Sequence, residues 1–299
     1  MQIDRRNFLR QSALLGATSL LPSFAHSAAP GFRLLVMATN WGFPYSMDEY
    51  CKRAKEAGYD GIEVWWKNDD ALFAALDKYG LEVGFLCSGN SNEYTKHAES
   101  FEAALTAATS QKRKRPVYIN CHSGKDYFSF EQNCKLIDIT TRISKQTNIP
   151  IYHETHRSRM LFAAHITRQF IEAKPDLRLT LDISHWCNVH ESLLQDQPET
   201  VAMALARAGH IHARVGHPEG PQVSDPRAPE WEPALKAHFA WWDEIVKQKQ
   251  TKGETLTVLT EFGPPDYMPT VPYTRQPLAN QWDINVHMMK LFKSRYGKG

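Results

Sequence analysis

Eight short, apolar, β-rich segments alternate with longer segments of helical character along this 299-residue chain. The apolar segments are residues 32–40, 60–66, 81–89, 116–124, 149–156, 177–186, 209–216 and 255–263. Strands that alternate with helices are joined by right-handed crossovers and form a parallel sheet. Eight such units that close on themselves make a (β/α)₈ barrel. The alternation therefore predicts an α/β protein with a single (β/α)₈, or TIM, barrel domain.

An open doubly wound sheet is the alternative arrangement of the same units. The turn after the first predicted strand, "TNWGFP", lacks the glycine-rich pattern of a dinucleotide-binding turn. No Gly/Ser-rich linker or change in composition divides the chain after residue 30. We therefore assign residues 28–299 to one barrel domain.

Residues 1–27 have the pattern of a cleavable twin-arginine signal peptide. Arg5 and Arg6 precede an apolar stretch, "SALLGATSLLPSF", and small residues precede a cleavage point after Ser27. The apolar stretch is shorter than the roughly 20 residues that span a bilayer, although a retained or lipid-attached anchor is the alternative. No later segment is apolar enough to cross a membrane. The sequence predicts a periplasmic protein without stable membrane insertion.

The charge and cysteine content exclude other classes of protein. The full chain has a formal net charge of +2, and residues 1–27 contain three arginines and one aspartate, so the mature chain is close to neutral. A neutral chain has no electrostatic attraction to nucleic acid, so no nucleic-acid partner is expected. Five cysteines without paired spacing do not indicate a disulfide framework.

Oxygen and nitrogen ligands follow four consecutive predicted strands. Glu154 lies in "YHETH", Asp182 and His185 in "LDISH", His212 in "HIHAR", and Glu261 in "LTEFG". The C-terminal strand ends of a barrel meet at one rim, so these side chains are expected to lie together. Several carboxylates with one imidazole and no thiolate suit Mn²⁺, Mg²⁺ or Co²⁺ better than a structural zinc ion. We therefore predict a divalent-metal site, with Mn²⁺ favoured and Zn²⁺ possible.

His210 and His212 point to the same side of an alternating strand, so spacing alone does not choose between them. His212 is the better candidate because it lies nearer to the C-terminal end of the strand.

With these motifs and "GYDGIEVWW", residues 32–295 resemble the sugar phosphate isomerase/epimerase superfamily of xylose isomerase-like barrels. The ketose 3-epimerases are the most informative members. The resemblance implies that Glu154, Asp182, His212 and Glu261 bind the metal, and that His185 and Arg214 contact substrate oxygens. It also implies that Glu154 and Glu261 remove and return a proton beside a ketose carbonyl through an enediolate. Which glutamate is the base is left open.

The predicted activity is thus metal-dependent isomerisation or epimerisation of a keto-sugar, with a small-molecule carbohydrate as the partner. Cleavage of a 3-keto-glycoside by β-elimination is the alternative, because it begins with the same proton removal. Long loops after His212 and Glu261, the second with Tyr267 and Arg275, differ from those of free-ketose epimerases. A phosphodiesterase of the abasic-site endonuclease kind and a non-catalytic carbohydrate-binding barrel are less favoured. The sequence is compatible with a homo-oligomer.

Other residues near the predicted rim are candidates for substrate binding. His122 and Lys125 follow the fourth strand in "NCHSGKDYF", where they could bind substrate hydroxyls or belong to a turn before the next helix. Trp41, Trp65 and Trp66 lie at or beyond strand ends. Each tryptophan could stack on a sugar ring or pack between the barrel and a helix.

Overall fold

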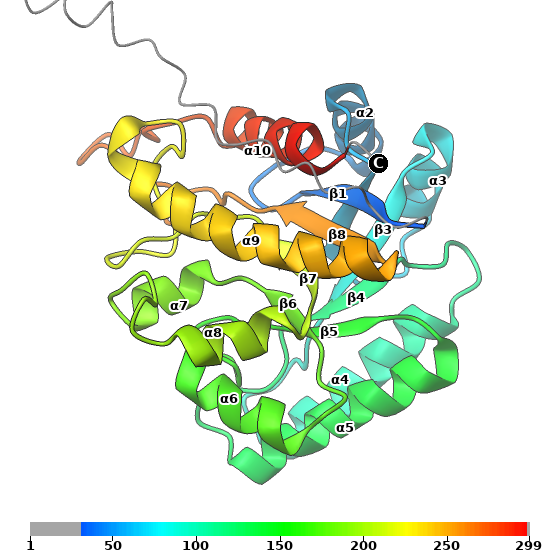
Figure 1. Cartoon of the computed structure of the whole chain (residues 1–299). Helices are drawn as coiled ribbons and strands as arrows, with labels where there is room; N and C mark the ends of the chain where they lie inside the picture. The colour runs from blue at the N-terminus through cyan, green and yellow to red at the C-terminus, as the bar shows by residue number, and fades with distance from the viewer. Residues whose placement is uncertain (1–30, 298–299) are drawn as a thin grey trace, which may run out of the picture.

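The computed structural model describes residues 31–297, which form a closed barrel of eight parallel strands surrounded by helices (Figure 1). The strands are β1 (Arg33–Thr39), β2 (Gly61–Trp65), β3 (Glu82–Cys87), β4 (Tyr118–Cys121), β5 (Ile151–Glu154), β6 (Leu179–Leu181), β7 (Ala208–His212) and β8 (Thr255–Thr260). They are neighbours in the order of the sequence. The predicted single-domain (β/α)₈ barrel is confirmed.

Helices follow the strands and cover the outside of the barrel (Figure 1). They are α2 (Met47–Ala57), α3 (Asp70–Tyr79), α4 (Tyr94–Ser110), α5 (Phe130–Thr147), α6 (Ala164–Ala173), α7 (Ser184–Val189), α8 (Pro198–Leu205), the 3₁₀ helix η1 (Pro229–Trp231), α9 (Glu232–Lys252) and α10 (Gln281–Tyr296). Within residues 31–297, none of these helices is long and apolar enough to cross a membrane. The predicted signal peptide lies outside the described residues.

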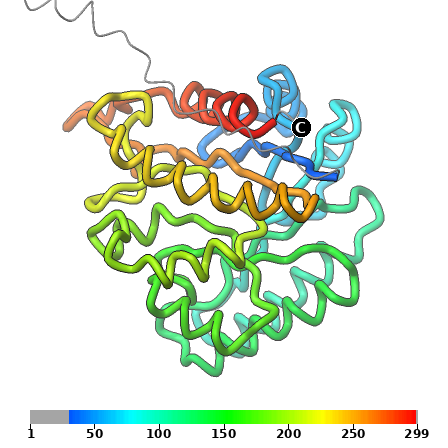
Figure 2. Tube along the Cα trace, in the orientation of Figure 1, coloured from blue at the N-terminus to red at the C-terminus, as the bar shows by residue number. Residues whose placement is uncertain are grey.

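Pairing between β1 and β8 closes the sheet. The register runs over six residue pairs, from Arg33 with Thr255 to Ala38 with Thr260. The first and last strands therefore lie side by side although more than 200 residues separate them in the sequence (Figure 2). Closure leaves no strand edge open and brings all eight C-terminal strand ends to one rim.

Local sequence signals set where the first helices begin and end. Ser46 accepts a hydrogen bond from the Glu49 amide at the start of α2, and Asp69 accepts from two amides at the start of α3. Gly58 and Gly80 end these helices with φ values of 102° and 61°, which glycine adopts without steric cost. After these glycines the chain continues directly into the next strands, β2 and β3.

The strand after Leu177 is shorter than the sequence predicted. β6 ends at Leu181, and the short helix α7 begins at Ser184, so His185 lies on a helix and not on a strand end. The next helix, α8, covers only Pro198–Leu205. Pro198 suits the first turn of a helix and fixes where α8 begins.

Side chains that point inward from the strands fill the lower part of the barrel. Leu35, Met37, Tyr118 and Leu259 form an inner cluster that is separate from the larger core between strands and helices. Gly84 on β3 leaves the space that the Tyr118 ring occupies, because a Cβ atom at position 84 would lie 2.4 Å from Tyr118 Cζ. Gly84 and Tyr118 thus fit together inside the barrel, below its C-terminal rim.

We predict that Gly84→Ala overpacks the barrel interior and lowers the free energy of unfolding by about 1–3 kcal/mol. Urea unfolding followed by circular dichroism measures the change. The same substitution in a Tyr118→Leu background should cost less, because the ring that the new methyl group meets is gone. An equal cost in both backgrounds would contradict the packing explanation.

Candidate metal and substrate site

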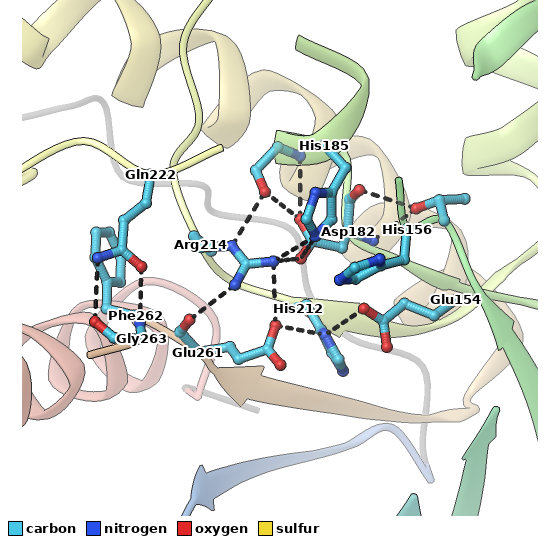
Figure 3. Close-up of polar contacts among 12 residues, drawn as sticks. Glu154, His156, Asp182, His185, His212, Arg214, Gln222, Glu261, Phe262 and Gly263 are labelled. Carbon is cyan, nitrogen blue, oxygen red and sulfur yellow. Dashed lines mark hydrogen bonds and ion pairs between the residues drawn. The ribbon is translucent and has the colours of Figure 1, made fainter. Parts of the chain in front are cut away.

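Four side chains from consecutive strands converge at the C-terminal rim of the barrel (Figure 3). Glu154 and His212 are the last residues of β5 and β7, and Asp182 and Glu261 directly follow β6 and β8. Each offers one ligand atom, and these atoms lie within 4.8 Å of one another. The structure therefore brings together all four residues that the sequence predicted as metal ligands.

The close contacts in this cluster lack hydrogen-bond geometry. His212 Nδ1 lies 2.8 Å from Glu261 Oε2 and 3.6 Å from Glu154 Oε1. All three atoms are nevertheless buried without a hydrogen-bond partner. Buried polar atoms that point at one another without hydrogen bonds are costly unless something else satisfies them. Three carboxylates and one imidazole suit a divalent cation such as Mn²⁺ or Mg²⁺, so the donor set fits the predicted metal.

The electrostatic field of the cluster favours positive charge. Burial by itself lowers the pKa of the His212 imidazole, but the charges of Glu261 and Glu154 outweigh it and raise that pKa well above its usual value. Burial by itself raises the pKa of Glu154, but the charges of His122 and His212 outweigh it and hold that pKa well below its usual value. The glutamate is therefore ionised, and the surrounding carboxylates stabilise a cation among them.

Arg214 is buried beside this cluster and contacts several of its members (Figure 3). Its guanidinium donates to Asp182 and lies 3.5 Å from Glu261 Oε2. Its Nη2 also lies 2.8 Å from His185 Nε2. Burial, together with the neighbouring His156 and the charge of Arg214, lowers the pKa of His185 well below its usual value, so this imidazole is neutral. Arg214 thus offsets part of the buried negative charge.

The two predicted substrate contacts after β4 differ in position. His122 Nε2 lies 2.6 Å from Glu154 Oε2, so His122 belongs to the site. His122 borders the cavity above the metal cluster, whereas Lys125 does not. Burial and the charge of Arg159 lower the pKa of Lys125. No ion pair or hydrogen bond joins the Lys125 side chain to the candidate ligands among the described residues, so the structure does not place Lys125 in the site.

His156 forms a further group with His122 and Glu154 that could hold a cation. Glu154 Oε1 faces His212 and Oε2 faces His122, so the two oxygens serve different neighbours. His156 Nδ1 lies 2.5 Å from the Arg157 carbonyl. Burial, followed by the charge of His122, lowers the pKa of His156 to about 3, which keeps its ring neutral.

Glu63 and Asn120 support the cluster from inside the barrel. Asn120 Nδ2 donates to Glu154 Oε2 at 2.8 Å. Glu63 is buried, with Oε1 3.8 Å from His212 Nε2 and Oε2 3.5 Å from His210 Nε2. His210 also approaches the Thr257 carbonyl at 3.0 Å, so it lies one layer deeper than His212. The preference for His212 over His210 agrees with this arrangement.

Neither Glu63 nor Asn120 is among the metal ligands or substrate contacts predicted from the sequence. Both residues point inward on strands whose neighbouring positions are apolar, and the alternation of "GIEVW" and "YINC" is the signal that marks them. Alternation shows only which side chains face the axis. The contact with a ligand in another strand comes from closure of the barrel.

A cavity of about 360 Å³ opens above the cluster, near the lower end of the size range of small-molecule sites. Glu261, Arg214, His122 and His156 border its polar part. Tyr267, from the loop after β8, also borders it. The Tyr267 ring lies 4.8 Å from the Arg214 guanidinium.

Arg275, from the same loop, is exposed and forms an ion pair with Asp266, away from the cavity. Of the two loop residues singled out in the sequence, only Tyr267 therefore reaches the cavity.

No family model and no curated protein matches this chain. Among solved structures, the 3-keto-D-glucoside 4-epimerase YcjR from E. coli has a TM-score of 0.57 at 14% identity, covering 88% of this chain and 100% of its own. D-allulose 3-epimerase from Methylomonas sp. has a TM-score of 0.57 at 16% identity, and the match covers 90% of this chain and 100% of the epimerase chain. Endonuclease IV from Thermus thermophilus has a TM-score of 0.52 at 12% identity, and the match covers 90% of this chain and 100% of the endonuclease chain.

These similarities show the fold. The chain shares the TIM-barrel fold of these structures, which is the fold that the sequence resemblance predicted. The same architecture carries an endonuclease, so function has to be argued from the side chains of the site.

We predict that Glu63→Gln weakens Mn²⁺ binding by roughly 10–100-fold. If Nδ1 of His212 faces a cation, the proton is on Nε2, 3.8 Å from Glu63 Oε1, and a neutral amide at position 63 stabilises this N–H group less than the carboxylate does. Isothermal titration of metal-free protein with Mn²⁺ measures the change. Glu82→Gln, at the half-buried first residue of β3, is the matched control and should leave the affinity unchanged. Equal affinities of both variants and the native protein would contradict a positioning role for Glu63.

Proposed function

We propose that this protein is a divalent-metal-dependent isomerase or epimerase that removes a proton beside the carbonyl group of a keto-sugar. The observation that carries the proposal is the placement of Glu154 and Glu261. Their ligand atoms lie within 4.8 Å of each other, beside His212 and below the cavity. Two carboxylates at one small site can remove a proton and return it.

In this proposal Glu154, Asp182, His212 and Glu261 hold the cation, with Mn²⁺ favoured over Mg²⁺, Co²⁺ or Zn²⁺. A bound divalent cation would supply Lewis-acid polarisation of the substrate carbonyl, which makes the neighbouring C–H group more acidic. Glu261 borders the cavity and reaches the substrate directly. Glu154 is buried and does not border the cavity. Its Oε2 lies 2.6 Å from Nε2 of His122, which does border the cavity. We assign one proton transfer to Glu261 and the other to the pair of Glu154 and His122.

Arg214 and His185 have different roles in this proposal. Arg214 borders the cavity, so it can donate a hydrogen bond to a substrate oxygen. His185 is fully buried and lies 2.8 Å from Arg214 Nη2. We therefore propose that His185 positions Arg214, whereas the family resemblance implied that His185 contacts the substrate itself.

β-Elimination of a keto-glycoside uses the same first step and is the second candidate. The two reactions differ in whether a leaving group departs from the enediolate or a proton returns to it. A carbohydrate-binding barrel without activity is less well supported, because binding alone does not require two carboxylates that can exchange a proton.

The test is proton NMR in D₂O with Mg²⁺-loaded protein, ketohexoses and methyl 3-keto-glucoside. We expect metal-dependent loss of one carbon-bound proton signal, and a decrease in the exchange rate of roughly 10²–10⁴-fold in Glu261→Gln and Glu154→Gln. New epimer signals would identify an epimerase, and released methanol a lyase. Glu82→Gln is the control for general effects of the substitution.

Metal content has to be measured for every variant, because a lost ligand and a lost proton acceptor both lower the rate. Exchange at the native rate in both metal-loaded glutamate variants would overturn the proposal. Exchange that persists after complete removal of divalent metal would also overturn it.

We also propose export to the periplasm, on the basis of the twin-arginine pattern in residues 1–27. Replacement of Arg5 and Arg6 by lysine should retain the protein in the cytoplasm, as cell fractionation and immunoblotting would show. Periplasmic recovery of the double variant at the native level would contradict this route.

A further inference from the structure

Two tryptophans stand at the mouth of the cavity, above its polar floor. Trp65 is the last residue of β2, and Trp41 follows β1. Both border the cavity, and their exposed fractions are 54% and 37%. An exposed tryptophan is ordinary when it stands alone. Here two from neighbouring strands border the same opening.

The strand register explains why they lie on one side. Thr39 on β1 pairs with Glu63 on β2, and both border the cavity. Trp41 and Trp65 each lie two residues further along the chain. Because side chains alternate with a period of two, Trp65 points to the same side of its strand as Glu63, one layer nearer to the rim.

Trp66 is the contrasting case. It is half-buried, and its ring lies 5.0 Å from Phe85, in the core between the sheet and the helices. From the sequence alone, each of the three tryptophans could stack on a sugar ring or pack between the barrel and a helix. The structure assigns packing to Trp66 and leaves Trp41 and Trp65 facing the cavity.

Trp41 is held in place by the loop after β8. A Cβ atom at Gly263 would lie 2.3 Å from the Trp41 ring, so the indole lies directly against this glycine. Gln281 Nε2 donates to the Trp41 carbonyl at 2.8 Å, and Tyr267 packs edge-on against the indole at 4.9 Å. A fixed aromatic surface loses little conformational entropy when a ligand covers it.

Trp65 is connected to the floor of the cavity. Its ring lies 5.7 Å from the His122 ring, and His122 contacts Glu154. A ligand that fills the cavity above the metal cluster therefore lies beside Trp65. Any part of it that extends beyond the reacting sugar lies at the aromatic mouth.

We infer that Trp41 and Trp65 form a subsite for a second ring, so that the substrate is a keto-sugar bearing a ring-containing substituent and not a free monosaccharide. The inference rests on the proposed function for the nature of the reacting sugar. The substituent, a sugar or an aryl group, presents an apolar face to the indoles, while the polar floor binds the keto-sugar. A cavity of this kind, aromatic at one end with a few polar groups at the other, fixes the orientation of its ligand.

The test uses glycosides that lack a ketone and therefore do not react. Calorimetry or tryptophan fluorescence gives the dissociation constants of phenyl β-glucoside and methyl β-glucoside for the metal-loaded protein. We expect the phenyl compound to bind about tenfold more tightly. Trp65→Ala and Trp41→Ala should bring the ratio of the two constants close to one, and Trp65→Phe should retain most of it.

Tyr127→Ala is the matched control, because Tyr127 is 62% exposed and does not border the cavity. It should preserve the ratio. Equal binding of the two glycosides by the native protein would overturn the subsite, whatever the proton-exchange experiment shows. A phenyl preference that depends on both tryptophans, together with no proton exchange, would instead support the subsite and reject the proposed reaction. Circular dichroism of each variant distinguishes loss of the subsite from unfolding.

Discussion

The pairing of β1 with β8 is the constraint on which the candidate site depends. It closes the sheet, so side chains at the ends of β5, β6, β7 and β8 meet around one axis. Without closure, Glu154 and Glu261 would lie on strands at different places in an open sheet. Gly84 and the Tyr118 ring beside it fill the interior below, which supports the rim from inside.

Burial of like charges is the main electrostatic problem of this rim. Three carboxylates lie close together with almost no contact with water, and such charges are stable only when they are paired or bind a cation. Arg214 and His212 supply part of the compensation. The ligand atoms that have no hydrogen bond are those a divalent cation would satisfy, so the donor set and the electrostatics lead to the same proposal.

The site has a polar floor and an aromatic mouth, and these parts come from different sides of the barrel. The floor is built mainly by β5–β8 and the residues that follow them, whereas Trp41 and Trp65 come from the β1 and β2 side. The loop after β8 joins the two parts, because Gly263 and Tyr267 contact Trp41 while Tyr267 also packs against Arg214. This division allows one part to perform chemistry while the other selects the substrate.

The sequence by itself determined the barrel, its eight units and the polar residues at four strand ends, because strand alternation and the position of such residues are local patterns. The family resemblance implied which four of these residues are the metal ligands. Tertiary structure decided which neighbours these residues have. In the folded chain His185 lies on α7 and contacts Arg214, Lys125 does not border the cavity, and Glu63 lies beside His212. Such contacts join residues that are far apart in the sequence, so they are fixed only when the closed sheet brings their strands together.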